Sequence, residues 1–255
     1  MSENKTSKYF KYAIGEIILV VIGILIALQI NNKNIENKER ALESQYIASI
    51  RSDLQDDIAT INHTISGNKE LLDGLNTLLS LLAKPNLDKE TKRQIFLYSA
   101  KYTYWYFNPE FSQVTLSQLK SSGDFQLIKN LEVTRGIASY SKGLEDCEHS
   151  KTEIKSYFHA FEDTQKSLLN QSLAKKTFEF IEENVNNMLA PLETFNDLIN
   201  EGNFFLQEDK ILIGRYYNDL LYYRTALNNL NVYISIQKEL AESLITLIDS
   251  NYKIN

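Results

Sequence analysis

Apolar side chains recur along most of this chain at alternating spacings of three and four residues. This spacing places them on one face of a helix and is typical of helices that pack at small crossing angles. Four stretches of the chain carry such a seam. The first consists of Leu54, Ile58, Ile61, Ile65, Leu72, Leu75, Leu79 and Leu82. The others consist of Ile95, Tyr98, Tyr102 and Trp105; of Ile137, Tyr140, Leu144, Cys147, Ile154, Phe158, Phe161 and Leu168; and of Tyr216, Leu220, Tyr223, Leu227, Leu230, Ile234, Ala241, Leu244 and Ile248.

Proline and capping residues divide the first half of the chain into predicted helices. The first seam predicts one helix that continues from an apolar N-terminal run to Lys84, where Pro85 ends it. A second helix is predicted over residues 88–107. The sequence Asn-Pro-Glu at 108–110 is typical of a helix start, with a cap, a proline at the first helical position and an acid in the first turn.

The third, short helix is predicted to end at Gly123, because glycine favours the left-handed conformation that lets a chain reverse after a helix. A long helix then begins near Leu131. Residues 174–203 are predicted to form shorter pieces, broken at Pro191 and Gly202. The last seam predicts a long helix that continues nearly to the C-terminus.

These elements predict an all-α fold: an N-terminal transmembrane helix followed by an antiparallel bundle of long helices with heptad seams. An extended coiled coil formed only between chains is the alternative. The short connections at 84–89 and 129–131 favour packing within one chain.

The run from Tyr12 to Ile30 contains nineteen residues and one charge. As a helix it reaches about 28 Å, close to the thickness of a bilayer's hydrocarbon core. A buried core helix is the alternative. The run is longer than the apolar part of a typical cleaved signal peptide, and no small-x-small cleavage site follows it. The sequence therefore predicts a cytoplasmic tail at 1–11, a signal anchor at 12–30 and an extracytoplasmic helical body at 31–255.

Aromatic and basic side chains precede this run, as is typical of a membrane interface. The predicted interface residues are Lys8, Tyr9, Phe10, Lys11 and Tyr12. Together with Lys5, these lysines favour a cytoplasmic N-terminus by the positive-inside rule. We therefore expect the bulk of the protein outside the cytoplasm.

Small residues and one carboxylate share a face of the predicted span. Gly15, Gly23 and Ala27 fall on one stripe with Glu16 beside it. Small residues allow helix backbones to approach closely in lipid, and a protonated carboxylate can bond to a neighbouring helix, so we expect this face to support assembly. The alternatives are that glycine and alanine are simply common in spans, and that Glu16 is hydrated near the cytoplasmic interface.

Composition narrows the function classes. The net charge is −6, which argues against nucleic acid as a partner. No glycine-rich phosphate loop is present, and Cys147 and His149 lack the second pair that a zinc site needs. The pair Asp146 and His149 only faintly resembles a di-iron half-motif. We expect a buried core thiol at Cys147, no metal or cofactor, and no catalytic residues.

One group of aromatic side chains is denser than a helix seam needs. Those that can wall a ligand pocket are Tyr98, Tyr102, Trp105, Tyr216 and Tyr223. The alternative, which we prefer, is ordinary packing of large rings between helices.

Two segments carry a family resemblance: KYFKYAIGEIILVVIGILIALQINN at 8–32 and LKSSGDFQLIKN at 119–130. With the helical lengths around them, they resemble an uncharacterised family of small membrane-anchored proteins common in Bacteroidota, described only as a domain of unknown function. Family members continue with Trp-Asn after the paired asparagines, where this chain has Lys33 and Asn34. The resemblance implies an inner-membrane protein with its bulk in the periplasm, and it implies no activity.

We therefore expect a non-enzymatic, membrane-tethered periplasmic interaction or sensory module. Its expected partners are the lipid bilayer and either a second copy of the chain or another inner-membrane protein. The first alternative is an ancillary subunit of an ion-driven inner-membrane complex, with Glu16 as a protonatable group. The second, a helical enzyme, is disfavoured by the absence of catalytic motifs.

Overall fold

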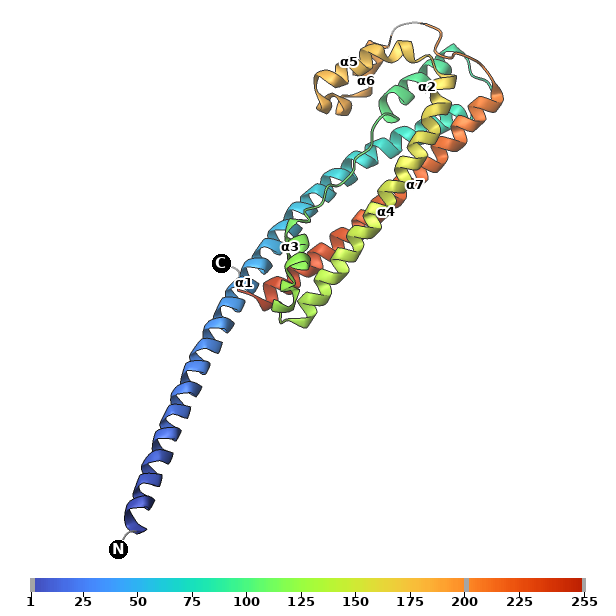
Figure 1. The fold of residues 1–255 in the computed structure, drawn as a ribbon. Coiled ribbons are helices and arrows are strands. Elements are labelled where there is room, and N and C mark those ends of the chain that lie inside the picture. The colour runs from blue at the N-terminus through green and yellow to red at the C-terminus, as the bar shows by residue number, and fades with distance from the viewer. Residues whose placement is uncertain (1–2, 200–201, 254–255) are drawn as a thin grey trace.

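The first element of the computed structural model is a single helix, α1 (Glu3–Leu82), of 80 residues. The structure describes residues 3–199 and 202–253, without the side chains of 3–8 and 11. At about 1.5 Å per residue, α1 extends for roughly 120 Å. Its N-terminal part projects alone from the rest of the molecule (Figure 1). The predicted first helix is confirmed to within two residues of its expected end at Lys84.

The chain returns along α1 in a second leg that is only partly helical. It comprises α2 (Lys89–Tyr102), an irregular segment at 103–113, α3 (Val114–Ser122) and the 3₁₀ turn η1 (Asp124–Leu127). Asp88 caps α2 by accepting a hydrogen bond from the backbone N–H of Thr91 at 2.7 Å.

Two details of the prediction for this leg are wrong. The helix that was expected over 88–107 ends at Tyr102, and the Asn-Pro-Glu sequence at 108–110 does not start a helix. The third helix starts only at Val114, after Gln113, whose side chain makes no capping bond. The physical reason is that buried side chains of α1 bind the backbone of this segment, which therefore does not need the hydrogen bonds of a helix.

Two long helices complete the body: α4 (Leu131–Leu168) and α7 (Lys210–Asn251). The side chain of Asn130 caps α4 by accepting from the backbone N–H groups of Glu132 and Val133. Asp209 caps α7 in the same way through Ile211. Both helices follow the predicted seams.

Cross-helix pairs give the direction of each leg. On α1 and α7, Arg51 pairs with Asp249, and Arg224 donates to Asn76, so these two helices run in opposite directions. The α4 helix packs against α7 and runs antiparallel to it, in the same direction as α1, because Asn130 at its start bonds to Asn251 at the end of α7. The second leg descends along α1, as described below. Both chain ends therefore point towards the same end of the body (Figure 1).

The short elements predicted over 174–203 lie at the end of the body far from the N-terminus (Figure 1). They are the 3₁₀ turn η2 (Gln171–Ala174), α5 (Lys175–Glu183), the 3₁₀ turn η3 (Val185–Leu189) and α6 (Leu192–Leu198). Pro191 is the N-cap of α6, and Gly202 lies outside any helix, so the expected breaks are confirmed. Among the described residues there is no strand, only a single bridge between Leu169 and Phe205. The all-α expectation is confirmed.

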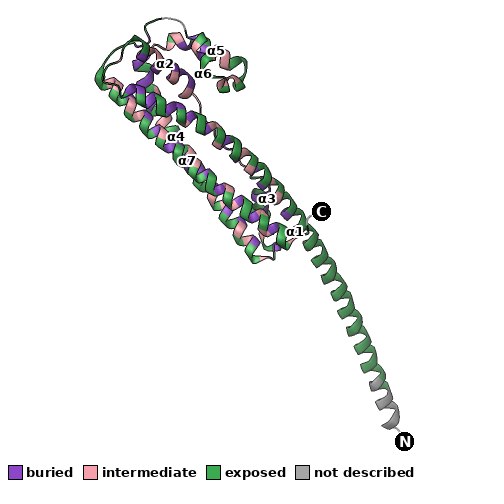
Figure 2. Cartoon of the chain, turned by 180° about the vertical axis from the view of Figure 1, so that it is seen from behind, coloured by how far each residue is buried: buried purple, intermediate pink, exposed green. Residues whose placement is uncertain are grey.

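The core extends along the whole body in two groups of buried side chains. Buried residues (purple in Figure 2) begin where α1 enters the body, and the projecting part of α1 is exposed on every side. The group nearer the projecting helix includes Tyr46, Ile47, Ile50, Leu54, Val133, Ile137, Leu244 and Ile248. The distal group includes Ile61, Leu75, Leu78, Ile95, Phe96, Phe161, Leu220, Leu227 and Leu230. The predicted seams therefore supply much of this core, together with residues outside them such as Ile47, Leu78 and Phe96.

Candidate functional site

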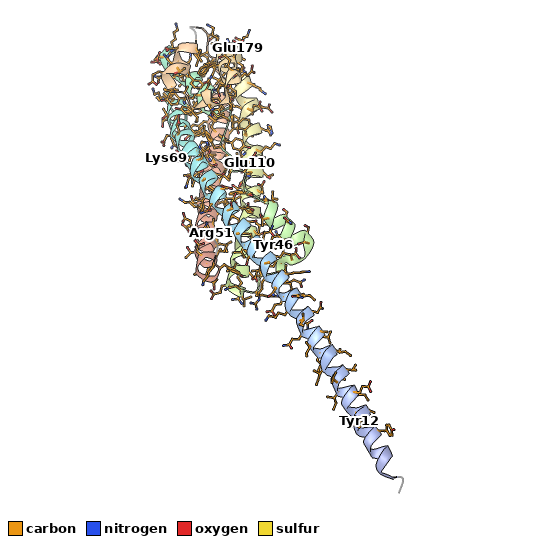
Figure 3. The ribbon with its side chains drawn as sticks, turned by 90° about the vertical axis from the view of Figure 1, so that its left-hand side faces the viewer. Tyr12, Tyr46, Arg51, Lys69, Glu110 and Glu179 are labelled. Atoms are coloured by element: carbon orange, nitrogen blue, oxygen red, sulfur yellow. The ribbon has the colours of Figure 1, made fainter. Side chains whose placement is uncertain are left out.

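The apolar run from Tyr12 to Ile30 forms the projecting part of α1, where each described side chain is exposed. In the described part of the chain, α1 is the helix that is long and apolar enough to cross a membrane. Exposed isoleucine, leucine and valine side chains on every side of a helix have no protein surface on which to be buried. Tyr12 lies near the tip of this helix, while Tyr46 and Arg51 lie where the body begins (Figure 3).

The predicted interface aromatics Tyr9, Phe10 and Tyr12 are also exposed, each by at least 70%. The side chains of Lys8 and Lys11 lie outside the described residues. The structure therefore places the aromatic half of the predicted interface at one end of the apolar run, and it does not test the basic half.

The predicted assembly face lies on the same projecting stretch. Gly15, Glu16, Gly23 and Ala27 are all exposed and none of them contacts the body. A Cβ atom added at Gly15 or at Gly23 would have no neighbour within 4 Å. The structure leaves this face open to another helix or to lipid.

The base of the body is fastened to α1 by buried polar groups. One carboxylate oxygen of Glu43, Oε1, accepts from the backbone N–H of Lys129 at 2.9 Å and from the hydroxyl of Tyr252 at 2.7 Å. Burial, and then the neighbouring Glu43 carboxylate, raises the pKa of Tyr252. One turn further along α1, the hydroxyl of Tyr46 donates to Asp124 at 2.8 Å. The connection between α3 and α4 and the residue after α7 are therefore held where α1 leaves the body.

Two more buried polar residues of α1 hold the irregular segment at 103–113. Asn68 is 0% exposed, and its Nδ2 donates to the carbonyl of Phe107 while its Oδ1 accepts from the N–H of Phe107, both at 3.1 Å. Asp57 is 1% exposed and accepts from the N–H of Ser112 at 2.7 Å. A non-helical segment cannot satisfy these backbone groups internally, so α1 supplies the partners.

Asp57 also joins α1 to α4. Its second carboxylate oxygen accepts from the hydroxyl of Tyr140, and Nε2 of Gln237 on α7 donates to the Tyr140 carbonyl at 2.9 Å. Burial is the main cause that raises the pKa of Asp57, and burial with this hydrogen bond raises that of Tyr140. Gln237 reaches α4 where Gly143 has no side chain, and a Cβ there would overlap its Oε1. The four legs thus share one buried polar contact.

A buried ammonium group lies in the distal half of the body. Lys101 on α2 is 1% exposed, and its Nζ donates to Glu70 on α1 at 3.0 Å and to the carbonyl of Ala190 at 2.7 Å. The same Nζ lies 4.9 Å from the ring centroid of Tyr102 and 5.2 Å from that of Phe195. Lys101 therefore joins the distal turns and α6 to the first two legs through charge and aromatic contacts.

The predicted pocket aromatics are divided between two places. Tyr216 and Tyr223 are 0% exposed in the core, where burial raises the pKa of both hydroxyls. Tyr98 and Tyr102 pack with ring centroids 5.6 Å apart. Tyr102 and Trp105 line a cavity of only about 10 Å³, which is closed on one side by η3. That volume holds about one water molecule, so the rings pack densely in this structure.

The structure also shows the surroundings of Cys147 and His149, the two candidate metal or nucleophile residues. Cys147 is buried, and desolvation is the main cause that raises the pKa of its thiol to about 11. At neutral pH it is therefore a thiol and not a nucleophilic thiolate. His149 is exposed, and among the described residues no group of three metal-binding side chains is found.

Gly123 follows α3 with φ of 76°, in the left-handed region. Leu119 belongs to the core near the projecting helix, and Phe125 packs against the same group. The turn at Gly123 therefore brings both side chains to the same core. The chain then continues through η1 to the start of α4.

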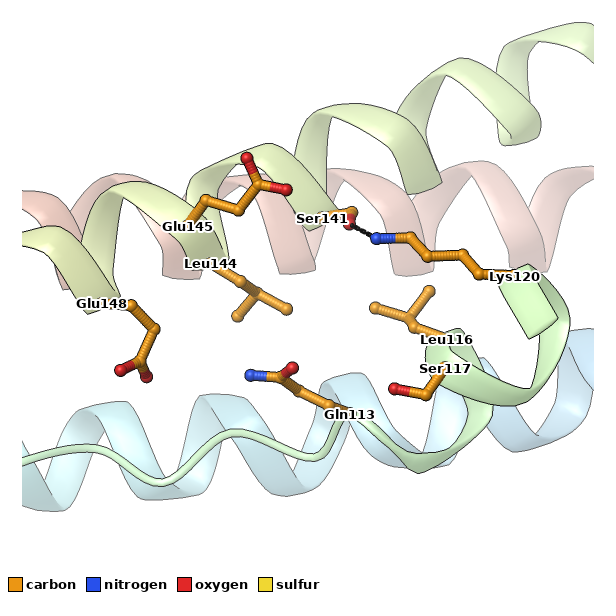
Figure 4. Close-up of a pocket in the computed structure, with 8 residues that line it drawn as sticks. All are labelled: Gln113, Leu116, Ser117, Lys120, Ser141, Leu144, Glu145 and Glu148. Carbon is orange, nitrogen blue, oxygen red and sulfur yellow. Dashed lines mark hydrogen bonds between the residues drawn. The ribbon is translucent and has the colours of Figure 1, made fainter.

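A polar hollow of about 270 Å³ lies between α3 and α4 (Figure 4). Nζ of Lys120 donates to Oγ of Ser141 at 2.7 Å across it, and Glu145 and Glu148 line its α4 side. Leu116 and Leu144 form its floor. The hollow is therefore a polar seam between the two helices, and Lys120 bridges it.

Sequence reasoning missed the buried polar residues of α1 and α2, although the seams contain a signal for them. Asn68 occupies the position that fills the seven-residue gap between Ile65 and Leu72. Lys101 lies three residues after Tyr98, on the same face of α2. A polar residue at a seam position marks a place where a buried backbone group or charge needs a hydrogen-bond or ion-pair partner.

The fold and these sites define an all-helical protein organised around one long helix, α1. The N-terminal stretch of α1 is apolar and exposed. In the body, α1 buries both apolar and polar side chains. Residues 16–133 match the model of a family described as "Family of unknown function (DUF6090)". This match covers most of the apolar stretch and the first two legs, as far as the start of α4. Neither a curated protein nor a solved structure matches the chain.

Proposed function

We propose that this protein is a membrane-tethered interaction or sensory module without catalytic activity, with its N-terminus in the cytoplasm and its helical body in the periplasm. The observation that carries the proposal is the continuity of α1. The apolar exposed stretch and the buried helix of the body belong to one helix from Glu3 to Leu82, with no break between them. A hydrophobic stretch with no protein cover is stable in lipid, and lipid is the partner that it implies.

The arrangement of contacts in the body suits a role in transmission. Glu43, Asp57 and Asn68 lie on one helix, and each bonds to a different part of the returning second leg. A change in the packing of the distal end is therefore coupled to the same helix that enters the membrane.

Topology is tested with reporter fusions to the full chain in an enteric host. Alkaline phosphatase fused after Asn255 is active only outside the cytoplasm, and green fluorescent protein at the same place, exported unfolded, is fluorescent only inside. We expect phosphatase activity, no fluorescence, and recovery of the protein in the membrane fraction. The opposite pattern, or recovery of full-length protein in the soluble fraction, would contradict the proposal. Capture of partners from native membranes, analysed by mass spectrometry, then identifies what the body contacts.

A second candidate is an ancillary subunit of an ion-driven inner-membrane complex, in which Glu16 is a protonatable group. The observation that favours it is that Glu16 lies on the exposed apolar stretch, far from the body. A carboxylate within an apolar span is costly, so such residues tend to have a function. If Glu16→Gln abolishes a cellular function without changing assembly, this candidate replaces the first.

A further inference from the structure

A cleft of about 560 Å³ lies at the membrane-distal end of the body. It lies where the end of α1 and the start of α2 meet the start of α7. Its lining comes from the α1–α2 connection, residues 82–88, with Lys92, and from the segment 205–214. A volume of this size is in the range of small-molecule sites.

The floor of the cleft is apolar and fixed. Leu82 and Phe205 are 5% and 1% exposed, and Leu87 and Ile213 are half-buried beside them. Phe205 is held in place by backbone bonds on either side of it. Phe204 accepts from the N–H of Asn170 at 2.9 Å, and the N–H of Leu206 donates to Leu168 at 2.8 Å. The floor is therefore formed before any ligand arrives.

The rim of the cleft carries three lysines, Lys84, Lys92 and Lys210, and two carboxylates, Asp88 and Glu208. Both carboxylates already have partners. Asp88 caps α2, and Glu208 forms an ion pair with Lys92. The backbone N–H of Thr91 is the main cause that lowers the pKa of Asp88, and the charges of Lys84 and Lys92 lower it further.

Two of the three lysines can bind a ligand. Lys84 and Lys210 are exposed, and neither has a carboxylate within ion-pair distance in the described part of the chain. Lys84 follows the end of α1, and Lys210 is the first residue of α7. On a chain whose net charge is −6, this cleft is a local cationic site.

We propose that the distal cleft binds a small organic carboxylate with an aromatic or branched apolar group. The apolar group lies on Phe205, Leu82 and Ile213, and the carboxylate bonds to Lys84 and Lys210. An apolar floor with a few convergent charged groups is the usual form of a small-molecule site, and charge-assisted hydrogen bonds provide orientation. The role of this cleft as the ligand site of a sensory module rests on the proposed function.

The test uses the full-length protein in lipid nanodiscs, with 3-phenylpropionate as the probe and isothermal titration calorimetry as the readout. Empty nanodiscs provide the correction for partitioning into lipid. We expect saturable binding of 3-phenylpropionate and about tenfold weaker binding of the neutral 3-phenylpropanamide. The double variant Lys84→Gln/Lys210→Gln is expected to lose a similar factor. The matched control Lys69→Gln/Lys142→Gln, which removes two exposed lysines elsewhere, is expected to bind like the native chain.

Three results would overturn the proposal: no saturable heat up to about 10 mM probe, equal binding of acid and amide, or equal loss in both double variants. Circular dichroism melting of each variant shows whether it is folded, and both lysines are exposed, so folding is expected to be retained. This experiment is independent of topology. Failure to bind with a correct reporter pattern rejects the cleft alone, and binding with the opposite reporter pattern rejects the tether alone.

Discussion

The side-chain amide of Asn68 forms both of the hydrogen bonds that the backbone of Phe107 cannot find within its own segment. Nδ2 donates to the Phe107 carbonyl and Oδ1 accepts from its N–H, each at 3.1 Å. Nδ2 also donates to Oδ1 of Asn231 on α7 at 3.0 Å. One buried side chain of α1 therefore holds an irregular piece of the second leg and a helix of the fourth.

Replacing Asn68 with leucine is expected to destabilise the body strongly. The buried backbone groups of Phe107 would lose their partners, at about 1–3 kcal/mol for each group left unsatisfied. For a body of this size, a loss of about 3 kcal/mol lowers the melting temperature by roughly 6–12 °C. Thermal melting followed by circular dichroism measures this. The control is Asn62→Leu at an exposed position of the same helix, where little change is expected. Equal melting temperatures in the two variants would show that the Asn68 bonds do not stabilise the body.

Asp57 is expected to make stability depend on pH. Burial raises the folded pKa of Asp57 above the ordinary value of an aspartate, so the folded state holds the proton more tightly than the unfolded state. The stabilising contribution is therefore fully present below the unfolded pKa and is lost as pH rises through the folded pKa.

The substitution Asp57→Asn removes this dependence and keeps an oxygen for the Ser112 N–H. Its stability relative to the native chain is expected to rise between pH 4 and pH 7, as measured by urea melts across that range. Glu239→Gln, at an exposed site, is the control and is expected to show a flat difference. A flat difference for Asp57→Asn as well would contradict a raised pKa.

Gly123→Ala is expected to cost about 1 kcal/mol, because alanine resists the left-handed backbone that φ of 76° requires. The melting temperature is expected to fall by a few degrees. No Cβ clash contributes, since nothing lies within 4 Å of the position where it would be placed. Gly123→Asn separates the two effects, because asparagine tolerates this backbone better and is expected to lose less. Equal losses for alanine and asparagine would show that the backbone conformation is not the cause.

Gly23→Ile is expected to break assembly of the anchor, because a branched side chain prevents close approach of a second helix on the face of Gly15, Glu16 and Ala27. Crosslinking of the full-length chain in membranes and a membrane self-association assay measure this. The matched control is Val21→Ile, which enlarges a side chain on the opposite face. Glu16→Gln keeps hydrogen bonding and is expected to preserve assembly. If Gly23→Ile and Val21→Ile give the same degree of crosslinking as the native chain, this face does not mediate assembly.

The long helices could be predicted from the sequence because their seams repeat without interruption. The starts of α4 and α7 also have visible caps in Asn130 and Asp209. The irregular segment at 103–113 could not be predicted in this way. Its conformation depends on Asn68 and Asp57, which lie about 40 and 55 residues earlier in the chain. A local cap signal at 108–110 was overridden by these distant hydrogen bonds.

The candidate sites also differ in whether the sequence alone predicts them. The exposed glycine face on the projecting part of α1 follows from helical spacing alone, since a Cβ added at Gly15 or Gly23 has no neighbour within 4 Å. The distal cleft requires Phe205 and Leu82 to line the same hollow, and the position of Phe205 depends on its bridge to Leu169. No periodicity in the sequence indicates such a bridge.

The central claim is that one uninterrupted helix connects the apolar anchor to the body. It is tested most directly by double electron–electron resonance between spin labels at Asn34 and Lys69, both exposed on α1, in the full-length chain in nanodiscs with Cys147→Ser as background. An unbroken helix separates these two backbone positions, 35 residues apart, by about 52 Å. We expect one narrow distance distribution near that value. A broad distribution, or a mean shorter by about 10 Å or more, would show a hinge between anchor and body and would contradict the account.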